Sequence, residues 1–130
     1  MRMRILLMMA VASLFIFSSC SHHLTGTWSV ANFKTLKAGE PGVTLSNIGS
    51  LTFHKNGTGE KKIQYTLLSS EIEDLSPFQW SLLDEYIIIE GPESDFSRIW
   101  IVTTGKSNQQ VWKTTDGKAE VKILELKKVK

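Results

Sequence analysis

The chain has 130 residues, which predicts a single domain, and its 15 Lys and Arg residues against 13 Asp and Glu residues give a formal net charge of +2. This balance gives no electrostatic support for nucleic-acid binding, which favours strongly basic surfaces. The single cysteine excludes disulfide bonds within the chain and any zinc site that needs several cysteines. A domain of about a hundred residues can nevertheless bury a sizeable core without disulfides.

The start of the chain has the organisation of an export signal. Arg2 and Arg4 make it basic, and residues 5–17 are apolar or small and carry no charge. This run is shorter than the ~20 residues that a membrane-spanning helix needs. The pattern predicts a secretory signal peptide over residues 1–19. Its removal would take away both arginines and leave equal numbers of basic and acidic residues.

Cys20 directly follows this leader, and its position leaves two interpretations. It is either a free thiol after ordinary cleavage or the attachment point of a lipid. A free thiol in an exported chain is exposed to oxidation and cross-linking, so the lipid is favoured. Residues 20–23 would then be a tether, whose last three residues span only ~10 Å at ~3.3 Å per residue. His22 and His23 are interpreted as solvated linker, because a metal site needs more ligands than lie nearby.

The rest of the chain, residues 24–130, predicts β-strands, because apolar and polar residues alternate with period two. We expect eight strands, at residues 27–33, 51–53, 63–67, 78–82, 86–89, 98–102, 110–113 and 118–126. The apolar phase of the last strand slips at Ile123 and Leu124, which predicts a bulge or bend there. No stretch after the leader favours a long helix.

Two hairpin turns are marked by residues that tolerate positive backbone φ angles. Asn56 and Gly57 follow the second strand, and residues 116–117 are Asp-Gly before the last strand. Together with Thr58 the first pair also matches an N-glycosylation acceptor, but the turn is the favoured interpretation.

Two longer stretches are interpreted as loops. Residues 34–49 contain three glycines and a proline, and would form a lid if the fold has an open pocket. Residues 68–77, LSSEIEDLSP, are acidic and are expected to be a solvated connection anchored by Ile72 and Leu75. The alternative is a docking segment for a basic partner.

Eight sequential antiparallel strands with short turns can close in two ways: as an up-and-down barrel or as a two-sheet sandwich. We favour the barrel, because closure removes the exposed edges of an open sheet. The interior of an eight-stranded barrel is either filled by side chains or holds one small ligand.

Residues 17–20, FSSC, resemble the lipobox of bacterial lipoproteins. This resemblance implies that the Cys20 thiol receives a diacylglyceryl group and that, after cleavage, its amine is acylated with a fatty acid such as palmitate. Several acyl chains give a firm anchor, since each buried methylene contributes ~0.8 kcal/mol. Ser21 replaces the acidic residue that retains many such proteins in the inner membrane. The resemblance therefore implies lipid anchoring at the outer membrane, facing the periplasm.

Four segments in order resemble the bacterial lipocalin-like lipoproteins, which belong with the calycin barrels. They are LTGTW at 24–28, LTFHKNGTG at 51–59, FQWSLLDEYIIIEG at 78–91 and VKILELKKV at 121–129. The resemblance implies that Gly26 lets the backbone pass closely and that Trp28 seals the closed end of the barrel. Better-known lipocalins pack an arginine over this tryptophan, and here Lys122 or Lys127 is expected in its place.

The resemblance implies a membrane-tethered module that binds a small apolar or amphipathic ligand. The candidate lining residues share the apolar phase of their strands: Phe53, Tyr65, Trp80, Ile88, Trp100 and Trp112. The residues themselves leave a second interpretation open, in which these side chains fill a narrow core. The protein would then be a structural or interaction protein of the cell envelope with its own protein partner.

Catalysis is not expected. A nucleophile–base pair would need a histidine, and His54, beside Lys55, is the one histidine of the predicted domain. Neighbouring acids such as Asp84 and Glu85 lie at predicted turns, where solvated carboxylates are ordinary. Glycine-rich phosphate loops are absent from the sequence. We therefore expect a protein that is not an enzyme and uses neither a cofactor nor a metal.

Overall fold

The computed structural model describes residues 24–114 and 120–129. The predicted leader over residues 1–19, Cys20 with the tether to residue 23, and the Asp-Gly turn at 116–117 lie outside the described residues. No helix among the described residues is long and apolar enough to cross a membrane.

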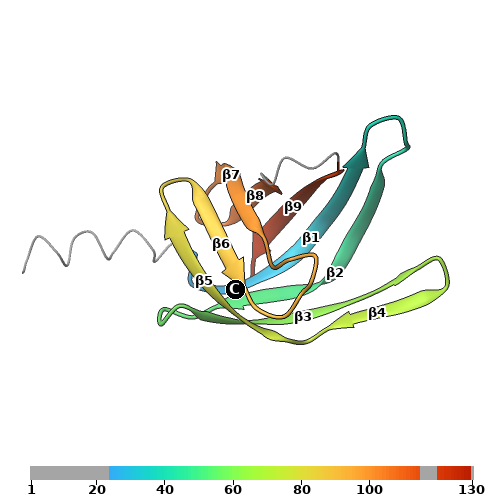
Figure 1. Cartoon of the computed structure of the whole chain (residues 1–130). Coiled ribbons are helices and arrows are strands. Elements are labelled where there is room, and N and C mark those ends of the chain that lie inside the picture. The colour runs from blue at the N-terminus through green and yellow to red at the C-terminus, as the bar shows by residue number, and fades with distance from the viewer. Residues whose placement is uncertain (1–23, 115–119, 130) are drawn as a thin grey trace, which may run out of the picture.

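The described chain forms nine antiparallel strands (Figure 1). They are β1 (Gly26–Lys37), β2 (Val43–Phe53), β3 (Thr58–Leu67), β4 (Ser70–Asp74), β5 (Pro77–Leu83), β6 (Tyr86–Glu90), β7 (Ile99–Gly105), β8 (Gln109–Thr114) and β9 (Glu120–Lys128). The hydrogen-bonded order is β2-β1-β9-β8-β7-β6-β5-β3-β4, and a further pairing of β2 with β3 closes the ring. Every strand except β4 belongs to this ring. The predicted eight-stranded up-and-down barrel is confirmed, and the sandwich alternative is wrong.

The additional strand β4 lies in residues 68–77, which were expected to be a loop; that prediction is wrong. β3 pairs Ile63 with Asp74 of β4 and Thr58 with Gln79 of β5, and both pairings follow one register. β4 and β5 are thus two parts of one interrupted strand opposite β3. The turn between β3 and β4 uses Leu68 (φ 52°) and Ser69 (φ 69°). Two positive φ angles are normally signalled by Asn or Gly, which these positions lack.

The predicted loop and lid over residues 34–49 is also wrong. β1 continues to Lys37 and β2 starts at Val43, so the connection is only residues 38–42 of a long hairpin. Gly49 (φ 142°) lies where β2 approaches β3 so closely that a Cβ atom would collide with the carbonyl group of Lys62. Beyond this point the pairing of β2 with β3 stops. The β1–β2 and β3–β4 hairpins therefore spread apart (Figure 1).

The two ends of the barrel differ, and we name them here. The wide end carries the hairpin tips at residues 38–42 and 68–69 and the β6–β7 loop, residues 91–98. The N-terminal end carries residue 24, where the described chain begins, and the turn at 84–85 among others.

The last strand carries no bulge at Ile123 and Leu124, contrary to the sequence prediction. β9 pairs with β8 in one continuous register, and the irregularity in its pairing with β1 lies between Val30 and Asn32 of β1. Lys122 is buried in the same inward phase as Leu124. The apparent slip arose because the inward position of a lysine broke the apolar pattern.

Candidate functional site

Four of the predicted lining residues meet in the centre of the barrel. Phe53 contacts Trp80 and Trp112 with ring centroids 5.4 and 5.9 Å apart, and Trp112 contacts Trp100 at 6.4 Å. All four side chains are buried. Phe53 also packs edge-on against Phe78. We call Phe53, Phe78, Trp80, Trp100 and Trp112 the aromatic cluster; its rings fill the space between the strands.

Each indole of the aromatic cluster also has a hydrogen-bond acceptor. Trp80 Nε1 donates to the carbonyl of Thr58 at 2.9 Å, and Trp100 Nε1 donates to that of Phe96 at 3.1 Å. Trp112 Nε1 donates to the Gln110 side chain at 3.1 Å. These bonds fix the rings in orientation, since a buried N–H without a partner is costly. The aromatic cluster is therefore a well-packed core whose buried indole N–H groups all have acceptors.

The other two predicted lining residues lie elsewhere. Ile87 and Ile89 are buried at 1% and 3% exposure, while Ile88 between them is only partly buried. The predicted inward orientation of Ile88 is therefore wrong, because its two neighbours are the residues that point inward. Tyr65 is partly buried at the wide end, where it packs against the core. Burial, followed by the nearby charges of Asp95 and Asp74, raises the pKa of the Tyr65 phenol.

Trp28 is completely buried at the N-terminal end, and its Nε1 donates to the carbonyl of Leu24 at 2.8 Å. The lysine over its ring is Lys128, with Nζ 4.8 Å from the ring centroid, and not Lys122 or Lys127 as expected. The register explains this, because Trp28 of β1 lies directly opposite Lys128 of β9. Burial lowers the pKa of the Lys128 ammonium.

Gly26 has a φ of 115°, a conformation that favours glycine. The space that a Cβ atom would need at this position is occupied by the Lys128 ammonium, which donates to the carbonyl of Thr25. A close approach at Gly26 therefore exists, and the group that approaches is the lysine side chain over Trp28.

The wide end contains charged side chains that point inward. Lys61 Nζ is completely buried and lies 3.0 Å from Asp74 Oδ2 and 3.0 Å from Ser94 Oγ. Burial raises the pKa of Asp74, but hydrogen bonds from Ser76 and Lys61 more than offset this, so that its pKa lies below the ordinary value. Lys61 therefore ties the β6–β7 loop to the junction of β4 and β5.

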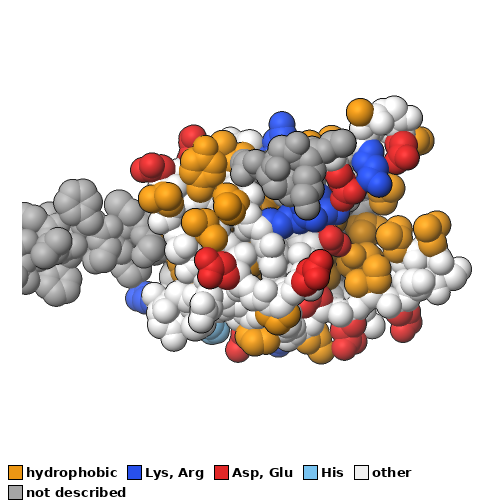
Figure 2. Space-filling view, in the orientation of Figure 1, with side chains coloured by type: hydrophobic (Ala, Val, Ile, Leu, Met, Phe, Trp, Pro, Cys, Tyr) orange, Lys and Arg blue, Asp and Glu red, His pale blue; other side chains and the backbone are white. Residues whose placement is uncertain are grey.

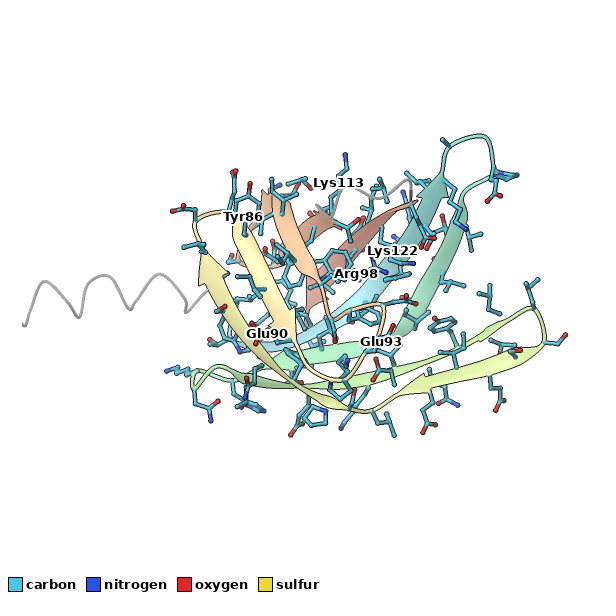
Figure 3. The ribbon with its side chains drawn as sticks, in the orientation of Figure 1. Tyr86, Glu90, Glu93, Arg98, Lys113 and Lys122 are labelled. Atoms are coloured by element: carbon cyan, nitrogen blue, oxygen red, sulfur yellow. The ribbon has the colours of Figure 1, made fainter. Side chains whose placement is uncertain are left out.

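Asp95 of the β6–β7 loop forms ion pairs with two cationic side chains. Its Oδ1 lies 3.9 Å from an Arg98 nitrogen and 3.7 Å from Lys122 Nζ, and Figure 3 shows both side chains reaching into the space between this loop and strand β9. Lys122 also bonds Glu120 at 2.8 Å, which holds the pKa of Glu120 below its usual range. We call Lys61, Asp74, Asp95, Arg98, Glu120 and Lys122 the charged cluster.

A cavity of about 400 Å³ opens at the wide end beside the charged cluster. Its apolar lining comes from Ile63, Tyr65, Ile72 and Phe96, and its polar lining comes from Glu73, Asp74, Glu93, Ser94, Asp95 and Arg98. Figure 2 shows apolar side chains gathered between the spread hairpins and acidic side chains beside them. The cavity thus offers both apolar surface and hydrogen-bonding groups, and its two lining segments contribute residues of each kind.

Of the residues that line this cavity, only Tyr65 was predicted from the sequence as a lining residue. Lys61 lies in the inward phase of β3, with Ile63 and Tyr65, so the alternation of this strand could have predicted that Lys61 is buried. Its partner Asp74 carried no such signal, because its segment was interpreted as a loop. The remaining polar groups are Glu73, in the same segment as Asp74, and four side chains from residues 91–98, which have no periodic pattern.

His54 has a partly exposed side chain with Nε2 3.9 Å from a Glu60 oxygen. Within residues 24–114 and 120–129, no group of three or more His, Cys, Asp or Glu residues is placed to hold a metal ion. His22 and His23 lie outside the described residues.

Comparison with models of known protein families finds no match to this chain, and comparison with curated proteins finds no similar sequence.

Proposed function

We propose that this chain is a lipid-anchored, non-enzymatic lipoprotein of the bacterial cell envelope whose barrel binds a small amphipathic molecule at its wide end. The observation that carries the proposal is the cavity of about 400 Å³, whose lining combines four apolar residues with six polar or charged ones. Small-molecule sites in proteins have volumes of roughly 300–1,000 Å³ and combine apolar walls with a few polar groups. The cavity supports a ligand site at the mouth of the barrel, away from the aromatic cluster.

The leader and the barrel support the rest of this proposal. The basic start, apolar run and FSSC sequence that ends at Cys20 are features of lipoproteins. The eight-stranded ring and the Gly26 to Trp28 segment at its N-terminal end agree with a lipocalin-like barrel. Ser21 after the cysteine favours the outer membrane, with the barrel in the periplasm.

The lining indicates what kind of ligand fits. Four apolar side chains offer room for one short hydrocarbon or ring system, and the polar side carries more carboxylates than cations. Carboxylates accept hydrogen bonds, so a ligand with hydroxyl or ammonium donors on its polar side is favoured. Arg98 offers donors at the same rim.

Native mass spectrometry of the full lipoprotein, purified in detergent and offered a total lipid extract, tests this proposal. We expect the mass of a chain without residues 1–19 but with acyl groups on Cys20, and a stoichiometric further addition from the ligand. Ile72→Arg, which brings a charged side chain into the cavity, should abolish the addition. The control Ile88→Arg alters another partly buried isoleucine outside the cavity and should retain it.

A bare acylated mass under all conditions would contradict ligand binding. It would favour the second candidate function, an interaction protein with a filled barrel. The aromatic cluster supports that candidate, and so do Leu68 and Leu75, which are 93% and 61% exposed at or beside β4. A photo-crosslinking residue at Leu68 would then be expected to capture one defined envelope protein in cells.

A further inference from the structure

The β5–β6 hairpin carries an apolar surface at the N-terminal end of the barrel. Leu82, Leu83 and Tyr86 are 38%, 61% and 36% exposed, and Leu83 pairs with Tyr86 across the hairpin. Figure 2 shows apolar side chains gathered on this side of the molecule, and Figure 3 places Tyr86 at the end opposite the spread hairpins. We call these three residues the hairpin patch.

The start of the described chain is fixed beside this patch. Leu24 is 4% exposed, and its carbonyl accepts the hydrogen bond from the buried Trp28 indole at 2.8 Å. Leu24 and Leu82 line the same surface hollow of about 530 Å³, together with Ile87 and Val102. The chain therefore leaves the barrel at the end that carries the hairpin patch.

The short tether limits how far this end can lie from a membrane. Four residue steps join Cys20 to Leu24, which span at most ~13 Å at ~3.3 Å per residue. If acyl chains on Cys20 lie in the bilayer, Leu24 is held within that distance of it. An apolar surface beside Leu24 then reaches the boundary between headgroups and acyl chains, where apolar side chains of peripheral proteins insert by ~5–10 Å.

We propose that the hairpin patch docks on the lipid bilayer that holds Cys20. This inference rests on the lipid anchor of the proposed function. Docking at this end turns the wide end, with its cavity, away from the membrane. Asp84 and Glu85 form the turn between β5 and β6, while Lys106 lies across the same hollow. Attraction to the bilayer therefore comes from the apolar side chains of the hairpin patch, because the two acids of the turn outnumber the one lysine near them.

Site-specific fluorescence of the acylated full-length lipoprotein in phosphatidylethanolamine–phosphatidylglycerol vesicles tests the docking. Acylation consumes the native thiol, so Leu83→Cys provides one site for an environment-sensitive label. The control Leu68→Cys places the label at the wide end, where the native side chain is 93% exposed, more than Leu83. We expect a blue shift of the label at position 83 and its quenching by brominated lipids, with neither effect at position 68. Tyr86→Cys should behave like Leu83→Cys.

Three results would contradict the inference, and they differ in what else they affect. An acylated, vesicle-bound protein whose labels at positions 83, 86 and 68 are all unquenched would overturn docking and leave the anchor intact. A mature protein whose mass shows no acyl group on Cys20 would overturn the anchor and the docking together. Quenching at position 68 equal to that at position 83 would also contradict the proposed orientation.

Discussion

The aromatic cluster in the barrel centre and the charged cluster at its wide end bury their polar atoms in different ways. The aromatic cluster contains large rings in mutual contact, whose indole N–H groups donate to nearby acceptors. At the wide end the buried polar atoms are full charges, such as Lys61 beside Asp74. Apolar burial stabilises a fold directly, whereas a buried ion pair is often no more stable than an apolar replacement.

This difference assigns the two regions different tasks. The aromatic cluster supplies stability, and the charged cluster keeps the β6–β7 loop, the β3–β4 hairpin and β9 in fixed positions around the cavity. Lys61 connects the loop to Asp74, and Asp95 connects the same loop to Lys122 of β9. We interpret the ion pairs as the means by which the mouth keeps its shape.

The sharpest test of this division compares a ring from each region. Trp112→Ala removes a fully buried ring that contacts Phe53 and Trp100, and should lower the free energy of unfolding by about 3–5 kcal/mol. Tyr65→Ala removes a partly buried ring at the cavity, and should cost about 1 kcal/mol. Urea unfolding measures both. Equal losses would contradict the assignment of stability to the aromatic cluster.

The second test breaks the most buried ion pair. Lys61→Met should lower the free energy of unfolding by about 3 kcal/mol, because Asp74 is left largely buried without its cation. The double variant Lys61→Met, Asp74→Leu should recover most of that loss, since an apolar pair replaces the ion pair. Chemical denaturation of the native protein, the single variants Lys61→Met and Asp74→Leu, and the double variant gives the coupling. A double variant less stable than Lys61→Met would contradict the prediction that an apolar pair replaces the ion pair.

The smallest expected effect is the loss of stability at low pH that comes from protonation of Asp74. The pKa of Asp74 is lower in the folded protein than in the unfolded chain, so its ionised form stabilises the fold. That contribution is present above the unfolded value of about 3.9 and is lost as the pH falls through the folded pKa. The unfolding midpoint of the native protein should therefore fall more steeply between about pH 5 and 3 than that of Asp74→Asn. Glu71→Gln, at an exposed acid of the same strand, is the control. Parallel curves for the native protein and Asp74→Asn would contradict the prediction.

The ring of strands was predictable because most strands show alternation with one buried face. The inward phase of β6 was not, since Ile87, Ile88 and Ile89 are all apolar and period two cannot choose between them. The β3–β4 turn escaped prediction because Leu68 and Ser69 carry no local signal for positive φ angles.

The site was less predictable than the fold. Its lining comes from the β3–β4 hairpin and from the β6–β7 loop, and these two segments are far apart in the sequence. The lysine over Trp28 likewise depends on the register between β1 and β9, which a single sequence does not specify. The alternation of apolar and polar residues predicts which face of a strand is buried, but it does not predict which residues of neighbouring strands lie opposite each other.

The central claim is that a small amphipathic molecule binds at the wide end of the barrel. Amide hydrogen exchange of the mature protein, with and without a total lipid extract, locates such a molecule most directly. We predict slower exchange on ligand binding in residues 63–74 and 91–98, which line the cavity, and unchanged exchange in β8. Protection confined to residues 82–87 and 102–107, around the hollow at the N-terminal end, would contradict the claim.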